Sequence, residues 1–368
     1  MKRRTFLQWG LAASMASPLL AALNQEQIDD AIGVLSKSVG SGQISSAVLH
    51  VTQRKTAVTR CFGKATENSM FLLGSISKPI CVTALMTLFD QNKFRLDDPL
   101  HKFIPQFAGD DREKVTIQHL LTHTSGLPDQ LLENNALRKN HAQLPEFVEH
   151  TIRTPLEFVP GSKYRYSSMG IMLALEVARL ISGVDILEFV DRTVFQPSGM
   201  KHSALGLGRF SSDDMVPVQT EFAAPEAGGG DPAAKDWDWN SFYWRKLGAP
   251  WGGAHASAPD VAKFLAEFLE ERGNVVRPQT ARLMVRNHNP RGLTARGLGL
   301  DTRMSAGPKG SETSFGHSGS TGTLAWADPM SETICVVLTS LPARAANPHP
   351  RDLAAADVAA AVSSASLD

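Results

Sequence analysis

The sequence is poor in the residues that mark several common classes of protein. Among its 368 residues there are only three cysteines, Cys61, Cys81 and Cys335. An odd and scattered set of this kind forms neither a disulfide framework nor a zinc cluster, so we expect buried free thiols. Neither charge is in surplus, because 37 Lys and Arg balance 37 Asp and Glu. This balance argues against a general affinity for nucleic acid or for an anionic membrane surface.

Long apolar runs are absent except at the very start. That stretch begins with Lys2, Arg3 and Arg4 and continues as an apolar, alanine-rich segment from Phe6 to Leu23. It resembles a twin-arginine export signal, which carries folded proteins across the inner membrane. We therefore expect residues 1–23 to be a signal and the protein to work in the periplasm or cell envelope. A bilayer span needs about 20 apolar residues, so an uncleaved signal would be the one membrane contact. The alternative is a chance basic start on an ordinary helix.

Hydrophobic patterning places strands near both ends of the chain and helices between them. "SSAVLHVTQRK" and "TAVTRCFGKA" have strand character, which returns after about residue 297 in "GTLAWAD" and "TICVVLTSL". We expect one domain over 24–368, of the α/β class and the α+β type. Its antiparallel sheet would be built from both chain ends, about 24–74 plus 291–368, and flanked by helices. A mostly helical region, about 75–290, would be inserted into it.

Two Ser-x-x-Lys matches occur, "SISK" at 75–78 and "SGMK" at 198–201, and either could arise by chance. Ser198 lies between proline and glycine, which are poor helix residues. "GSISKPICVTALMTLF" instead reads as a helix start, where a proline in the opening turn costs little. Ser75 and Lys78 would then share one face at a helix N-terminus, whose dipole favours an alkoxide and disfavours a protonated lysine. The pair is either a nucleophile with its base or an N-cap serine beside a solvated lysine.

Seven segments of the chain, taken in order, carry a resemblance that favours the catalytic alternative. They are "GSISKPI", "LDDPLHKFIP", "TIQHLLTHTSGLPD", "PGSKYRYSSMGIMLAL", "PSGMKHS", "GAPWGGAHASAPDVAKF" and "FGHSGSTGTLAWADP". From about 45 to 340 the chain resembles the penicillin-recognising serine hydrolases, the family of serine β-lactamases and penicillin-binding proteins. The most similar branch is that of class C β-lactamases and family VIII esterases. The resemblance implies the serine β-lactamase and DD-peptidase fold and an acyl-serine mechanism without metal or organic cofactor.

The resemblance also assigns site residues. Ser75 would be the acylated nucleophile, Lys78 its partner, and Tyr166 a general base whose pKa the Lys78 ammonium lowers. Which of Lys78 and Tyr166 takes the proton from Ser75 stays open, and Tyr164 is the alternative tyrosine.

His317-Ser318-Gly319 occupies the place of the Lys-Thr-Gly triplet of the lactamases. His317 would be a catalytic residue, and Ser318 and Gly319, together with Ser168, would contact substrate. The backbone N–H groups of Ser75 and Ser320 would form the oxyanion hole.

Two departures from the family pattern bear on the substrate. Ser168 stands where the family has an asparagine amide, and His317, mostly neutral at pH 7, stands where the lactamases have lysine. Both changes argue against efficient β-lactam hydrolysis. We expect an exported carboxylesterase or D-amino-acid-peptidase-like enzyme acting on a small ester, peptide or β-lactam substrate. The alternatives are a class C-like β-lactamase and a non-catalytic relative that binds cell-wall fragments.

Two other features remain ambiguous. His119 and His123 have the spacing of zinc ligands, but the glutamate of a metalloprotease motif and a third ligand are missing, so we expect them to pack and hydrogen-bond. The aromatic cluster from Trp237 to Trp251 could line an acyl pocket or fill the core.

Overall fold

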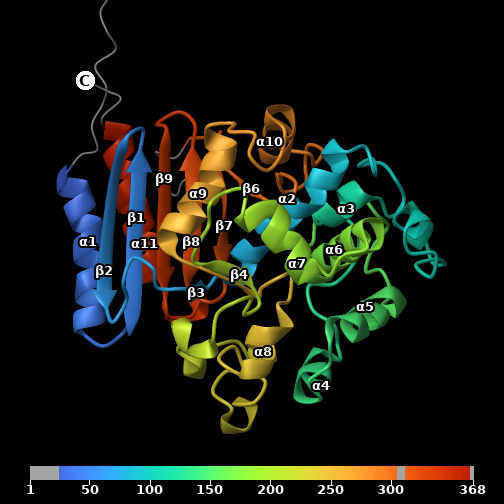
Figure 1. Ribbon diagram of the computed structural model, residues 1–368, viewed down its shortest axis with the longest axis horizontal. Coiled ribbons are helices and arrows are strands. Elements are labelled where there is room, and N and C mark those ends of the chain that lie inside the picture. Colours follow the sequence, from blue (N-terminus) through green and yellow to red (C-terminus); the bar gives the residue numbers. More distant parts are fainter. Residues whose placement is uncertain (1–24, 305–310, 365–368) are drawn as a thin grey trace, which may run out of the picture.

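The computed structural model describes residues 25–304 and 311–364 (Figure 1). The predicted signal at 1–23 lies outside the described residues. Within the described ranges, no helix combines the length and the apolarity that crossing a bilayer requires.

The main sheet joins the two ends of the chain. Its six strands run in the order β2-β1-β9-β8-β7-β6, and every neighbouring pair is antiparallel. The strands are β1 (Ser46–Gln53), β2 (Thr56–Gly63), β6 (Asp301–Thr302), β7 (Phe315–Gly319), β8 (Thr323–Asp328) and β9 (Thr333–Thr339). β1 pairs with β9 over seven residues, with Val51 opposite Cys335. The predicted antiparallel sheet from both termini is confirmed.

Helices cover both faces of this sheet (Figure 1). On one face α1 (Gln25–Gly40) and α11 (Pro350–Ser364) pack together over Leu49 and Trp326. On the other face α9 (Ala258–Leu269) packs over Val48 and its neighbours. Successive strand residues point to opposite faces, and because both faces are covered, β1 and β9 are buried along almost their whole length. α9 belongs to the sheet layer although it lies within the 75–290 segment.

The rest of the chain forms a helical region around one fully buried helix. α2 (Ser77–Asp90) has buried side chains on all sides and packs against α6 (Ser168–Ser182). An all-round apolar helix of this kind is typical of a protein core. The other helices are α3 (Ile117–Leu121), α4 (Asn134–Lys139), α5 (Leu144–Arg153), α7 (Ile186–Val190), α8 (Phe242–Leu247) and α10 (Pro278–Val285).

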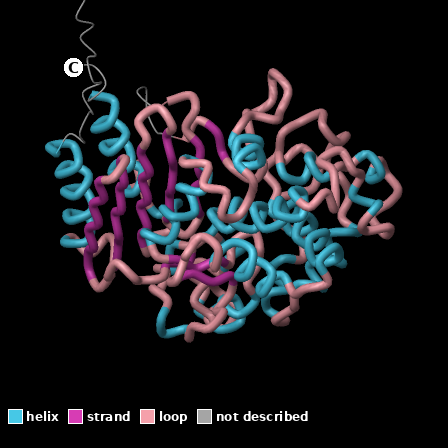
Figure 2. Tube along the Cα trace, turned by 45° about the horizontal axis from the view of Figure 1, so that its top comes forward, coloured by secondary structure: helices cyan, strands magenta, loops and turns pink. Residues whose placement is uncertain are grey.

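A second, three-stranded sheet with the order β3-β5-β4 was not predicted. Its strands are β3 (Phe71–Leu72), β4 (Ser203–Leu205) and β5 (Ala254–Ala256). Figure 2 shows them running across the view beneath the long strands. Strands of two or three residues are too short to show a period of two, so no sequence pattern could reveal them.

One expectation about cysteines was wrong. Cys81 and Cys335 are buried, but Cys61 is exposed. Cys61 lies on β2, the edge strand of the main sheet, several of whose side chains are exposed to solvent.

Candidate active site

Ser75 lies where β3 gives way to α2. The predicted helix start is confirmed in outline, although Gly74–Ile76 is a 3₁₀ turn and the α-helix begins at Ser77. Gly74 has φ +55°, and a Cβ there would lie 2.9 Å from Thr321 Oγ1 and 3.2 Å from the Ser320 nitrogen. Glycine therefore lets the segment that carries Ser75 approach the turn after β7.

Lys78 is a buried amine in direct contact with Ser75. Its side chain is 1% exposed, and Nζ donates to Ser75 Oγ at 2.9 Å and to the Trp251 carbonyl at 2.8 Å. No carboxylate lies within ion-pair distance of it among the described residues. Burial lowers the pKa of Lys78 to about 7, against the opposing pull of Asp129. A large fraction of Lys78 is therefore neutral at pH 7 and able to accept a proton.

Tyr166 lies beside this pair. Its ring centroid is 4.7 Å from Lys78 Nζ, and its buried hydroxyl is directed toward Ser75 without reaching hydrogen-bond geometry. Burial raises the pKa of Tyr166 to about 12, although Arg296 and Ser75 act to lower it. The predicted lowering was wrong because loss of solvent outweighs the charges. Tyr166 is therefore a neutral phenol at pH 7, suited to relaying a proton.

The two histidines of "HLLTH", His119 and His123, each accept a hydrogen bond from a backbone N–H group. His123 Nδ1 accepts the Ser167 N–H at 3.2 Å, and its ring lies 4.5 Å, centroid to centroid, from that of Tyr166. His119 Nδ1 accepts the Thr116 N–H at 3.2 Å and caps α3. Both make the packing and hydrogen-bonding contacts that we expected.

Ser168 opens α6 and carries an acidic partner that sequence analysis missed. Its hydroxyl donates to Asp129 Oδ1 at 2.6 Å, and its backbone N–H donates to the same oxygen at 3.0 Å. Ser167 caps the helix by accepting the Gly170 N–H at 2.9 Å. The place of the family's amide is thus held by a hydroxyl that orients a carboxylate.

Both ring nitrogens of His317 form hydrogen bonds within the protein, one with Arg296 and one with the Ser318 carbonyl. Arg296 donates to Nε2 at 2.8 Å, so Nδ1 carries the proton and donates to the Ser318 carbonyl at 2.7 Å. Burial and the Arg296 cation hold the pKa of His317 well below its usual range. The imidazole is neutral at pH 7, as the sequence suggested.

Gly319 ends β7 where this strand meets the segment that carries Ser75. A Cβ on Gly319 would lie 2.1 Å from the Leu73 carbonyl oxygen, closer than any side chain can come. Thr321 and Thr323 fasten this contact, since their hydroxyls donate to the carbonyls of Leu72 at 2.6 Å and Leu73 at 2.7 Å. These bonds fix Ser320 opposite Ser75.

Two hollows flank Ser75. The less open of the two, which we call the enclosed cavity, has a volume of about 190 Å³ and is lined by Ser75, Lys78, Tyr166, Ser168 and Ser320. A more open cleft of about 320 Å³ is lined by Ser75, Tyr166, His317, Ser318, Gly319 and Ser320. The structure therefore brings all eight predicted residues together, while their roles stay predictions. Tyr164 lines only the open cleft, and neither Ser198 nor Lys201 lines either hollow.

The tryptophans satisfy both interpretations of the aromatic cluster. Trp239, Trp244 and Trp251 are at most 7% exposed, and all three line the enclosed cavity. Arg138 stacks on Trp244, with its guanidinium carbon 4.0 Å from the ring centroid. The wall of the cavity is therefore aromatic and rigidly packed.

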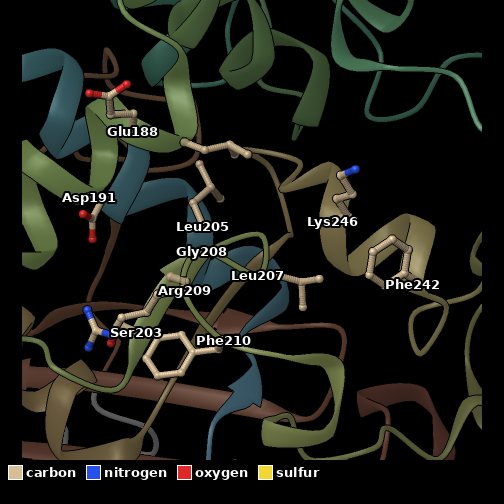
Figure 3. Close-up of a pocket in the computed structure, with 12 residues that line it drawn as sticks. Glu188, Asp191, Ser203, Leu205, Leu207, Gly208, Arg209, Phe210, Phe242 and Lys246 are labelled. Carbon is tan, nitrogen blue, oxygen red and sulfur yellow. The ribbon is translucent and has the colours of Figure 1, made fainter.

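A larger hollow of about 540 Å³ lies elsewhere (Figure 3). Figure 3 shows Glu188 and Asp191 on one side of it and Lys246 and Phe242 on the other. It contains none of the predicted site residues. Its volume exceeds that of either hollow beside Ser75, so we place the candidate site by the chemistry of the lining residues and not by size.

Several site residues escaped sequence analysis because no local sequence pattern marks them. Asp129 and Arg296 lie in loops, whereas Arg138 is on α4, Asp301 on β6 and Arg351 on α11. The one available signal was for Asp129, which ends the quoted segment "TIQHLLTHTSGLPD".

Comparison with known proteins identifies a family for the chain. A family model described as Beta-lactamase matches residues 26–360. A candidate D-alanyl-D-alanine carboxypeptidase of Salmonella enteritidis is 24% identical over 383 residues, covering 89% of this chain and 86% of that protein. Esterase EstB of Burkholderia gladioli is 30% identical over 209 residues, covering 52% of this chain and 51% of its own length.

A solved structure shares the fold. The D-amino acid amidase of Ochrobactrum anthropi SV3, complexed with D-phenylalanine, superposes with a TM-score of 0.73 at 19% identity, covering 91% of this chain and 99% of the amidase. The fold and the family match over nearly the whole described chain lead to one conclusion: the protein belongs to the β-lactamase family of hydrolases.

Proposed function

We propose that the protein is a serine hydrolase that works through an acyl-serine intermediate. Ser75 Oγ attacks the substrate carbonyl while Lys78 takes its proton, and the backbone N–H groups of Ser75 and Ser320 hold the oxyanion. Tyr166 relays the proton from Lys78 to the leaving group, which departs as alcohol or amine. Water then attacks the acyl carbonyl and gives its proton to the same base, which returns it to Ser75 Oγ as the carboxylic acid is released. The contact that carries this proposal is the 2.9 Å hydrogen bond from Lys78 to Ser75, made by an amine whose pKa is about 7.

The enclosed cavity suits the acyl part of the substrate. The acyl group stays bound through both steps, whereas the leaving group must escape, which the more open cleft beside His317 allows. About 190 Å³ walled by three tryptophans accommodates a short or single-ring acyl group. Long fatty acyl chains do not fit this volume.

Asp129 favours substrates with an amino group next to the carbonyl. Its Oδ1 is held by Ser168, while the carboxylate lines the cavity and forms no ion pair with a described residue. A carboxylate in a partly dry pocket attracts an ammonium strongly. We therefore propose esters or amides of small amino acids as substrates. Of the two expected activities, carboxylesterase and D-amino-acid-peptidase-like enzyme, this choice favours the second. The similarity to an amidase complexed with D-phenylalanine supports this choice.

Labelling tests the mechanism. Wild-type protein should react with a fluorophosphonate probe at Ser75, and Ser75→Ala should not. If neither protein is labelled and neither hydrolyses any ester, the enzyme proposal fails and the non-catalytic alternative is favoured.

Matched substrates test the role of Asp129. The methyl esters of D- and L-phenylalanine are compared with methyl 3-phenylpropionate, which lacks only the amino group. The wild type should prefer one amino ester, and Asp129→Asn should lose about 10- to 100-fold of that preference in kcat/KM, as expected for a hydrogen bond to a charged group in a half-buried site. Glu226→Gln, which removes an exposed carboxylate at the same cavity, is the matched control and should keep the preference.

β-Lactam hydrolysis is the second candidate activity, supported by the family match. Ser168 and His317 lack the amide and the permanent cation that we associate with lactam binding. We expect nitrocefin turnover far below ester turnover. Nitrocefin hydrolysis at least as fast as that of the best ester would reverse this ranking.

We also propose export through the twin-arginine route. The support is the "MKRRTFLQ" start followed by an apolar run. Cell fractionation of the full chain should place it in the envelope or periplasm, and the double variant Arg3→Lys/Arg4→Lys should remain inside the cell. Equal distribution of the two proteins would contradict the proposal.

A further inference from the structure

Arg296 is a buried cation directly behind the catalytic tyrosine. It lies in the loop between α10 and β6 and is 1% exposed. Its guanidinium carbon lies 5.5 Å from the Tyr166 ring centroid, and one terminal nitrogen donates to His317 Nε2 at 2.8 Å. The other terminal nitrogen pairs with Asp301. Because Asp301 is 27% exposed, solvent screens its charge more than that of Arg296.

Because Arg296 donates to His317, the His317 ring stays neutral and β7 contributes no positive charge to the site. Arginine can only donate hydrogen bonds, so Nε2 of His317 must present a lone pair, and its second nitrogen is already occupied by the Ser318 carbonyl. A neutral ring with both nitrogens engaged supplies no positive charge to the reaction. The nearest permanent charge of that sign is on Arg296, since Arg351 is directed to the Gly319 and Thr323 carbonyls.

We propose that Arg296 is a positioning residue of the acylation step, which holds His317 in its neutral form and, from behind Tyr166, favours the deprotonated form of Lys78. The inference rests on the proposed function, in which Lys78 accepts the proton of Ser75. Arg296 does not touch the substrate in this role, and it acts through Lys78 and Tyr166.

The other charged and titratable groups around Lys78 are accounted for. Cys81 from α2 and His123 from the loop after α3 are uncharged neighbours at neutral pH, as is His317 from β7, and Tyr164 lies on the loop that carries Tyr166. Asp129 opposes Arg296 at Lys78, and Asp301 offsets part of the Arg296 charge from the solvent side. Burial is the main cause of the low pKa of Lys78, and Arg296 lowers that pKa further.

The distances set the size of the effect. The Lys78 nitrogen and the Arg296 guanidinium lie 4.7 and 5.5 Å from one ring centroid, so they are separated by no more than about 10 Å. Two like charges at about 10 Å in a medium of effective dielectric constant about 20 change a pKa by about one. Loss of Arg296 should therefore raise the pH at which Lys78 becomes active by about one.

The test is the pH dependence of kcat/KM for p-nitrophenyl butyrate between pH 5.5 and 10. Arg296→Gln should move the acidic limb of the profile upward by about one pH unit, and Arg296→Lys, which keeps the charge, should leave it within a few tenths of wild type. Asp301→Asn should move the limb the other way, by a few tenths, because it removes the anion that offsets Arg296. Arg112→Gln, which removes another buried arginine that donates to the Arg153 and Thr154 carbonyls, is the control and should not move it.

The inference would be overturned if the acidic limb of Arg296→Gln did not move and activity fell equally at every pH. Arg296 would then have only a structural role. If Arg296→Gln does not fold, Asp301→Asn decides, since an unmoved or raised limb there overturns the inference as well. Failure of the proposed function is recognised separately, because wild-type Ser75 would then not be labelled by the fluorophosphonate. If the wild type is labelled but the acidic limb of the pH profile does not shift in any variant, only the role proposed for Arg296 is refuted.

Discussion

Replacing Lys78 by methionine should abolish activity and yet stabilise the fold at neutral and acidic pH. Lys78 is buried beside Ser75 with no carboxylate partner among the described residues, and its pKa falls from the ordinary 10.5 to about 7. Methionine is unbranched, has a similar length and carries no charge, so it can occupy the same space without the cost of burying an ammonium.

The magnitude follows from linkage between protonation and folding. Each pKa unit corresponds to about 1.4 kcal/mol, so the fall from 10.5 to about 7 costs the protonated folded state about 5 kcal/mol. The folded pKa is the lower one, so between pH 7 and 10.5 the unfolded chain binds more protons and wild-type stability rises with pH. The full cost is present below pH 7 and disappears near pH 10.5.

The substitution also removes hydrogen bonds. The Trp251 carbonyl and the Ser75 hydroxyl lose their donor, and an unsatisfied buried acceptor costs about 1–3 kcal/mol. Below pH 7 we therefore expect Lys78→Met to be more stable than wild type by about 2–4 kcal/mol. Above about pH 10 it should be less stable, so the two stability curves should cross between about pH 8 and 10.

Urea unfolding of both proteins at pH 6.5, 8 and 9.5 measures this difference. Lys55→Met, at an exposed position in the β1–β2 turn, is the control and should differ little from wild type at any pH. A Lys78→Met protein that is less stable than wild type by the same amount at all three pH values would refute the reasoning, because Lys78 would then carry no burial cost.

Three further predictions concern catalysis and packing. Wild-type kcat/KM for a p-nitrophenyl ester should rise with pH through a midpoint near 7, the pKa of Lys78, and a flat profile from pH 5.5 to 8.5 would contradict its role as base. Tyr166→Phe should lower kcat by about 10²- to 10⁴-fold as the proton relay is lost, and near-normal turnover would remove Tyr166 from the mechanism. Gly319→Ala should lose activity and about 1–3 kcal/mol of stability, since its methyl group meets the Leu73 carbonyl, whereas Gly33→Ala, in open space on α1, should be neutral or slightly stabilising. Thermal unfolding and ester turnover of the two glycine variants test this prediction. Equal stability and activity of the two variants would contradict it, because the backbone around residue 319 would then accommodate a methyl group.

The shared face of Ser75 and Lys78 and the frame around it could be predicted because these signals are local. A serine and a lysine three residues apart at a helix start must share a face, whatever the rest of the chain does. Strand-like stretches near both termini likewise required one sheet assembled from both ends. The short strands β3, β4 and β5 offered no such pattern, because two or three residues do not display a period.

The electrostatics of the site could not be derived from the sequence. We expected a lowered pKa for Tyr166 because a neighbouring ammonium was foreseen, but burial raises it to about 12. How far a group is removed from water depends on every element packed around it, and no local pattern encodes that. For the same reason Asp129 and Arg296, which reach the site from loops, became visible only in three dimensions.

By itself, then, the sequence determined where Ser75 and Lys78 stand and which fold presents them, since helix geometry and strand patterning act over short stretches of chain. Only the tertiary structure decided what state they are in. It buries Lys78 and brings the Asp129 carboxylate and the Arg296 guanidinium near it, and these charges act through space between segments that are far apart in sequence.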